Sequence, residues 1–279
     1  MNLAAALRRD LAERARKYAE AEGLPHCFSY GQPPIVCFAP YDHGARHGNF
    51  LQGSHKAIRA NPTWRKRLEK VHTGRRSLPS AERGRWMELD SCTSSDALLM
   101  NIFCHPSGSG NGKVAALLGV EPGVTPRFGY KARVPLASGK FDRTEVDLRL
   151  GDLLIEAKLT ESNFQRAEKV LLTAYRDFSD VFDRKQLPQT DAHYLSYQLL
   201  RNVLAAHALQ CSFCVLVDAR RPDLAGAWYA VMKCVKPVAL RTKLRISTWQ
   251  EVAEAVPPKL RTFLAAKYGI SGEGLKSCH

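Results

Sequence analysis

Three residues of this chain, Asp147, Glu156 and Lys158, have the types and spacing needed for metal-dependent cleavage of a phosphodiester bond. Mg²⁺ prefers oxygen ligands, and one or two carboxylates with waters and a substrate phosphate usually complete its coordination. A lysine beside such a centre can hold the attacking water or stabilise developing negative charge. This chemistry requires a fold that brings the three side chains together.

A β-hairpin over residues 143–159 would do so. Gly151 and Asp152 suit a two-residue turn, because glycine at the first central position favours type II′. Pairing outward from that turn sets Asp147 directly opposite Glu156. Like charges that face each other across a sheet are destabilising, and a bound cation would relieve the repulsion.

Side chains alternate between the two faces of a strand, so the hairpin should have one apolar and one charged face. The predicted apolar face consists of Val146, Leu148, Leu150, Leu153, Ile155, Ala157 and Leu159. The predicted charged face consists of Glu145, Asp147, Arg149, Leu154, Glu156 and Lys158. A sheet with one solvated face is the alternative interpretation, and an ion pair between Glu145 and Lys158 would fit it.

Asp147 followed by Glu156-Ala157-Lys158 resembles the PD-(D/E)XK phosphodiesterase superfamily, whose fold is restriction-endonuclease-like. Val146 stands where the name-giving pattern has proline. The resemblance implies that Asp147 and Glu156 bind Mg²⁺, for which Mn²⁺ can substitute, with the backbone carbonyl of Ala157 as a further ligand. It also implies that Lys158 assists the attack by water.

Residues 94–103 and 197–202 resemble an uncharacterised bacterial branch of these nucleases, and the resemblance covers roughly residues 85–268. In some superfamily members a glutamine from a helix reaches the metal site. The resemblance therefore makes Gln198 a fourth catalytic candidate, with a plain surface glutamine as the alternative. An additional acid from the helix before the sheet is left open among Glu88, Asp90 and Asp96.

The charge balance indicates a polyanionic partner. The chain has 279 residues, with 41 basic and 27 acidic side chains and a formal net charge of +14. Such a surplus attracts nucleic acid. The predicted DNA-backbone contacts are Arg65, Lys66, Arg67, Lys70, Arg75 and Arg76. A solvated helix face is the alternative, because charge runs are often only that.

The eight cysteines are too sparse for a disulfide scaffold, and the sequence shows neither a secretory signal nor an apolar run of about 18 residues. We therefore expect reduced thiols and a cytoplasmic protein without a membrane segment.

The pattern of apolar residues predicts an α/β fold: a mixed central sheet flanked by helices, with a helical, basic N-terminal elaboration. The expected regions are 1–89 for this elaboration, 90–268 for a catalytic core and 269–279 for a mobile tail. Strands are expected at 127–134, 143–159, 211–218 and 244–248. Helices are expected at 2–22, 51–89, 94–104, 162–185, 191–208 and 222–236, and two short helices broken at Pro257-Pro258 are expected over 249–268.

Together, the resemblance and the charge predict a Mg²⁺-dependent nuclease that cleaves DNA, as an endonuclease. Cleavage of both strands would favour a homodimer. A non-catalytic nucleic-acid-binding protein on a nuclease-like fold is one alternative, and a structural protein with an unspecific basic surface is another.

Overall fold

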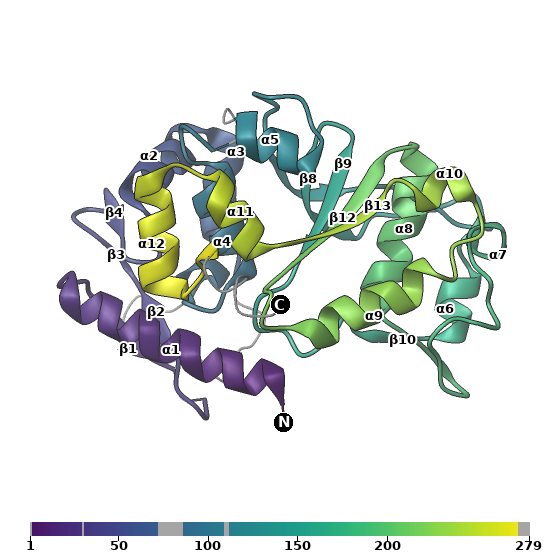
Figure 1. Ribbon diagram of the computed structural model, residues 1–279, viewed down its shortest axis with the longest axis horizontal. Helices are drawn as coiled ribbons and strands as arrows, with labels where there is room; N and C mark the ends of the chain where they lie inside the picture. The colour runs from purple at the N-terminus through teal and green to yellow at the C-terminus, as the bar shows by residue number, and fades with distance from the viewer. Residues whose placement is uncertain (1, 30, 72–85, 109–111, 273–279) are drawn as a thin grey trace. The chain divides into compact units, whose positions relative to one another are not determined.

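The computed structural model describes residues 2–29, 31–71, 86–108 and 112–272. The chain forms two compact units (Figure 1). The terminal unit comprises Met1–Pro126 with Trp249–His279, and the sheet unit comprises Arg127–Thr248. The boundary expected at residue 89 differs from this division, because residues 90–126 and 249–268 group with the N-terminal segment.

In the terminal unit, helices are combined with short strand pairs. Its elements are α1 (Leu3–Ala21), β1 (His26–Phe28), β2 (Val36–Phe38), β3 (Pro40–Tyr41), β4 (Arg46–His47), α2 (Gln52–Ala60), α3 (Pro62–Arg65), the 3-10 helices η1 (Lys66–Glu69) and η2 (Glu88–Asp90), α4 (Ser95–Phe103), α5 (Gly112–Leu118), α11 (Trp249–Ala255) and α12 (Pro258–Tyr268).

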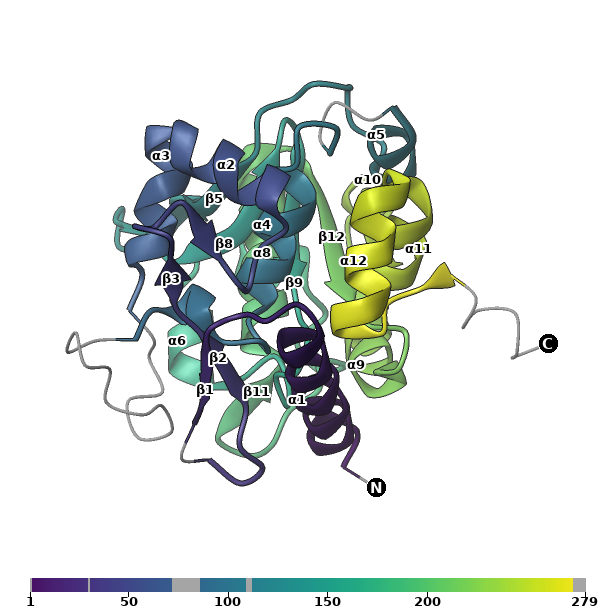
Figure 2. The ribbon, with the colours of Figure 1, turned by 90° about the vertical axis from the view of Figure 1, so that its left-hand side faces the viewer.

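Helix α1 begins where the Asn2 side chain accepts a hydrogen bond from the backbone of Ala5, an N-cap that satisfies a free helix donor. Its buried side includes Leu7 and Leu11. α1 packs against α12 (Figure 2). The long basic helix expected over 51–89 is instead divided into α2, α3 and η1 within its described part.

In the sheet unit, all residues are described. Its elements are β5 (Arg127–Lys131), β6 (Val134–Pro135), β7 (Phe141–Asp142), β8 (Glu145–Leu150), β9 (Leu153–Ala157), β10 (Arg166–Glu168), α6 (Lys169–Thr173), α7 (Phe178–Val181), β11 (His193–Leu195), α8 (Tyr197–Leu209), β12 (Ser212–Val217), α9 (Pro222–Met232), α10 (Val238–Arg241) and β13 (Leu244–Thr248).

The central sheet has five strands in the order β13-β12-β9-β8-β5. β12 runs parallel to both β13 and β9, whereas β8 runs antiparallel to β9 and β5. The sheet is therefore mixed, and the predicted α/β class is confirmed. Helices α8 and α9 pack on β12, and α8 also packs on β9 (Figure 1).

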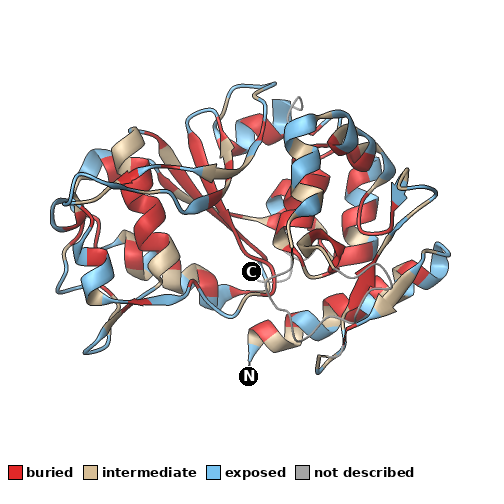
Figure 3. Cartoon of the chain, turned by 180° about the vertical axis from the view of Figure 1, so that it is seen from behind, coloured by how far each residue is buried: buried red, intermediate tan, exposed pale blue. Residues whose placement is uncertain are grey.

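β9 is buried along its whole length, and β12 is buried except at Ser212 (Figure 3). A strand with neighbours on both edges and a helix on one face has little contact with solvent, so polar side chains on it need internal partners. The alternative interpretation, a hairpin with one solvated face, is therefore wrong for β9.

One strand pairing limits two predicted helices of the sheet unit: the helix expected at 162–185 is reduced to α6 and α7, and the helix expected at 191–208 is confirmed only from Tyr197 onward. Residues 162–185 and 191–208 each contain one strand of an antiparallel pair, in which Arg166 stands opposite Leu195 and Glu168 opposite His193. This pairing between distant segments overrides local helical patterning. As a result α8 starts only at Tyr197, after Ser196, which adopts a left-handed conformation with a φ of 59°.

Two further expectations concern the whole chain. The seven cysteines that are described are all free thiols. Among the residues that the structure describes, no helix combines the length and the apolar character needed to cross a bilayer.

Candidate active site

The hairpin of β8 and β9 places the first candidate carboxylate. Leu150 pairs with Leu153 and Leu148 with Ile155, which is the predicted register. The regular ladder ends at the Leu148–Ile155 pair, and Asp147 is the next residue outward from the turn. At that point the backbone N–H of Ala157 donates to Oδ2 of Asp147 at 2.9 Å. The carboxylate of Asp147 is thus attached directly to the strand that carries the second acid.

The pairing of β8 is irregular at Asp147, although the burial of its side chains alternates as predicted. The pairing of β5 with β8 omits Gly129, which would stand opposite Asp147 and has a φ of 60°. Val146, Leu148 and Leu150 are buried, whereas the residues between them are more exposed. The predicted alternation of buried and less buried positions is therefore confirmed for this strand.

Glu156 and Lys158 form a buried ion pair at the end of β9. Nζ of Lys158 donates to Oε1 of Glu156 at 2.7 Å, and the two residues are 5% and 1% exposed, respectively. The Lys158 ammonium also lies 5.8 Å from the centre of the Phe164 ring. Lys158 thus pairs with the neighbouring acid of its own motif.

Burial alone would lower the pKa of Lys158, but nearby carboxylates raise it above its ordinary value. Glu156 is the strongest of these, followed by Asp147 and Glu161. The backbone of Leu159 donates to Oε2 of Glu161 at 2.7 Å, so this acid is held close to the same strand end. The neighbouring carboxylates therefore stabilise Lys158 as a cation, and its ammonium group donates a hydrogen bond at this strand end.

Asn202 on α8 is the contact that the sequence interpretation missed. Its Nδ2 donates to Oε2 of Glu156 at 2.7 Å, and the residue is fully buried. Arg201 fixes the other end of the amide, since one terminal nitrogen donates to Oδ1 of Asn202 at 2.9 Å and to the carbonyl of Glu145 at 2.7 Å. The sequence signal for this contact was the presence of two polar residues, Arg201 and Asn202, inside an otherwise apolar stretch of helix.

Gln198 lies one helical turn before Asn202 on α8, at the i, i+4 spacing that shares a helix face. Its side-chain Oε1 is buried without a hydrogen-bond partner in the described structure, as is Nε of Arg201. Buried polar atoms normally have hydrogen-bond partners, so the unpaired Oε1 makes Gln198 a candidate for contact with a group outside the described residues.

The oxygen atoms of Asp147, Glu156 and the Ala157 backbone lie within one strand end, but a larger acidic cluster is not formed. Within the described residues, no group of three His, Cys, Asp or Glu side chains could hold a metal ion together. The candidate ligand atoms are all oxygens, which suit a hard cation such as Mg²⁺ that retains several waters.

The predicted basic residues lie in the terminal unit and differ in their surroundings. Arg65 and Lys66 are exposed, whereas Arg67 and Lys70 are partly buried and form ion pairs with Asp96. Arg75 and Arg76 lie outside the described residues.

The three acids left open as additional ligands are held within the terminal unit. Asp96 pairs with Arg67, Glu88 lies 3.0 Å from Nζ of Lys70, and Asp90 lies 3.1 Å from Nε2 of His47. These contacts account for all three acids as structural partners of basic groups.

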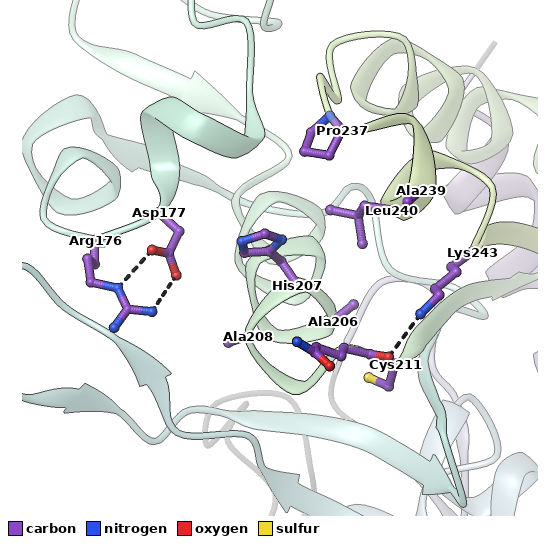
Figure 4. Close-up of a pocket in the computed structure, with 11 residues that line it drawn as sticks. Arg176, Asp177, Ala206, His207, Ala208, Cys211, Pro237, Ala239, Leu240 and Lys243 are labelled. Carbon is purple, nitrogen blue, oxygen red and sulfur yellow. Dashed lines mark hydrogen bonds and ion pairs between the residues drawn. The ribbon is translucent and has the colours of Figure 1, made fainter.

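A cavity of about 420 Å³ opens at the other end of α8 (Figure 4). Arg176, Asp177, His207 and Lys243 provide its charged and polar lining. Arg176 and Asp177 form a bidentate ion pair, which lowers the pKa of Asp177. The predicted site residues do not line this cavity, so it is separate from the carboxylate site.

The fold and the site together define a class. A mixed five-stranded sheet flanked by helices, with two acids and a lysine on adjacent central strands, is a restriction-endonuclease-like arrangement. A family model described as restriction endonuclease associating with ARP matches residues 14–269. The chain therefore belongs to this restriction endonuclease family. No curated protein and no solved structure matches it.

Proposed function

We propose that the sheet unit is a PD-(D/E)XK-type, Mg²⁺-dependent nuclease that hydrolyses DNA phosphodiester bonds as an endonuclease. The observation that carries the proposal is the buried Glu156–Lys158 ion pair, with Asp147 bonded to the same strand end. Membership in a restriction endonuclease family implies DNA as the substrate. The formal net charge of +14 supports binding to a polyanion.

The residues present fit a hard cation. Asp147, Glu156 and the carbonyl of Ala157 would hold Mg²⁺, and the orphan Oε1 of Gln198 could accept a hydrogen bond from a water of its hydration shell. When bound, Mg²⁺ would supply Lewis-acid stabilisation of charge on the phosphoryl oxygens.

Lys158 acts in this proposal as a hydrogen-bond donor and a fixed positive charge. The surrounding carboxylates keep it protonated, so it would orient the attacking water or stabilise the charged transition state. Its orientation is set by Glu156, which accepts its hydrogen bond in an almost solvent-free environment.

Exposed Arg65 and Lys66 are proposed to contact the DNA backbone. Phosphate contacts by such residues provide affinity without reading sequence. Because each chain carries one such carboxylate site, we propose that cleavage of both strands uses a homodimer.

The test is plasmid cleavage in the presence of Mg²⁺ by the wild type and by Asp147→Ala, Glu156→Ala and Lys158→Ala. Each of the three variants should lose cleavage by orders of magnitude. Glu168→Ala is the matched control, because this acid is exposed in the same unit, and it should retain activity.

Equal cleavage by the wild type and the three site variants would refute the assignment of the site. DNA binding without any cleavage by the wild type would instead support the non-catalytic nucleic-acid-binding alternative. Negligible, salt-insensitive DNA affinity would support the structural alternative.

A further inference from the structure

We infer that Asn202 is a positioning residue, held in place by Arg201, that fixes Glu156 in the orientation required for metal binding. The inference rests on the proposed function of the same site and assigns a role to α8 in it. It concerns a side chain that would not touch the substrate or the metal.

The orientation of the Asn202 amide follows from the chemistry of its two neighbours. Arginine can only donate hydrogen bonds, and an ionised carboxylate can only accept them. Arg201 therefore meets Oδ1 of Asn202 at 2.9 Å, and Nδ2 must face Oε2 of Glu156 at 2.7 Å. The amide has a single arrangement that satisfies both contacts.

Arg201 itself is anchored to the strand that carries the other acid. The terminal nitrogen that holds Asn202 also donates to the backbone carbonyl of Glu145 at 2.7 Å. Glu145 begins β8, two residues before Asp147. The chain of contacts from β8 through Arg201 and Asn202 to Glu156 thus links the two acid-bearing strands through the helix.

The neutral amide leaves Glu156 able to bind a cation. A carboxylate can accept about four hydrogen bonds, and here Lys158 and Asn202 each use one, on different oxygens. Without the Asn202 contact, the carboxylate could turn until both oxygens face the Lys158 ammonium. Asn202 thereby opposes a closed ion pair that would compete with the metal.

The test compares Asn202→Leu with the wild type, because leucine has a similar size and lacks the donor. Mn²⁺ affinity of the full chain without DNA, measured by calorimetry, should fall about 10–100-fold, the usual effect of losing an outer-shell partner. In DNA cleavage kcat should fall, whereas KM for DNA should change less than about twofold, because KM then reports contacts that the variant retains.

Val203→Ala is the matched control on the same helix, because Val203 is fully buried in the core cluster. It should lower the unfolding temperature without lowering Mn²⁺ affinity. If Asn202→Leu does not fold, Asn202→Ser replaces it, because its shorter side chain also loses the direct contact with Glu156.

Unchanged Mn²⁺ affinity in a folded Asn202 variant, while the wild type binds Mn²⁺ and cleaves DNA, would overturn the positioning role alone. The same loss of Mn²⁺ affinity in Val203→Ala would overturn it too, because the effect would then be one of stability. Absence of both Mn²⁺ binding and cleavage in the wild type would overturn the proposed function together with this inference.

Discussion

Replacing Lys158 by methionine tests whether the ion pair at the centre of the site is as buried as the structure shows. Methionine preserves most of the apolar stem and removes the ammonium. At 2.7 Å, the attraction between Nζ of Lys158 and Oε1 of Glu156 is about 6 kcal/mol with an effective dielectric constant of about 20.

Only part of that attraction contributes to stability, because both charges were removed from water when the chain folded. Breaking a buried pair by removing one partner typically costs about 3–5 kcal/mol, since the remaining charge is left uncompensated. The Asn202 donor still contacts Glu156 in the variant, so we expect a loss of about 3 kcal/mol, near the lower end of that range.

Urea unfolding followed by circular dichroism at neutral pH measures this loss. The double variant Glu156→Gln/Lys158→Met should lose about 1–3 kcal/mol less than the sum of its single variants, because the pair then disappears as a unit. Lys140→Met is the control, and it should stay within about 0.5 kcal/mol of the wild type, because Lys140 is exposed in the same unit. A loss below about 1 kcal/mol for Lys158→Met, with additive single variants, would refute the reasoning.

Three further predictions concern the terminal unit. Burial lowers the pKa of Lys267 well below its ordinary value, although its Nζ donates to the backbone carbonyl of Asn49 at 2.9 Å and lies within 5.4 Å of three aromatic ring centres. Unfolding therefore takes up a proton below about pH 10, so the free energy of unfolding should rise as the pH approaches about 10, and Lys267→Met should flatten this rise. An equal slope in both proteins would contradict this prediction. Burial lowers the pKa of His55 to about 4, so stability should be lost as the pH falls from about 6.5 toward 4, and less so in His55→Phe; equal acid sensitivity in urea titrations would contradict this. Removing both Arg65 and Lys66 should reduce the salt dependence of DNA affinity by about two counterions, whereas Arg67→Ala should also lower the unfolding temperature; an unchanged salt slope in the double variant would count against the proposed backbone contacts.

The hairpin was predictable because its signals are local. Gly151 and Asp152 set the turn, and the apolar positions on either side set the pairing of Leu148 with Ile155. The end of the regular pairing before Asp147 was not predictable, since the turn and the apolar pattern both favour pairing that continues outward from Leu148.

The burial of β9 and the start of α8 depend on contacts between distant segments. Residues 153–157 contain no signal that helix α8 covers them. The strands β10 and β11 form where helix was predicted because two distant segments pair with each other. The same limit explains why Gln198 was predicted as a site residue and Asn202 was not. Both are on one face of α8, and only the packing of that helix on β9 shows which amide meets Glu156.

The charges around Lys158 support the proposed metal requirement. The carboxylates of Asp147, Glu156 and Glu161 act on the Lys158 ammonium, and the Arg201 guanidinium is linked to Glu156 through Asn202. Three acidic and two basic groups leave an excess of one negative charge. A DNA phosphate approaching this strand end would be repelled, because like charges in a poorly solvated site interact strongly. A divalent cation held by Asp147 and Glu156 would cancel the excess and convert repulsion of the phosphate into attraction. The proposed cation would then be needed for the phosphate to enter the site as well as for the chemistry, so chelation should weaken contact with the scissile phosphate before any bond is cleaved.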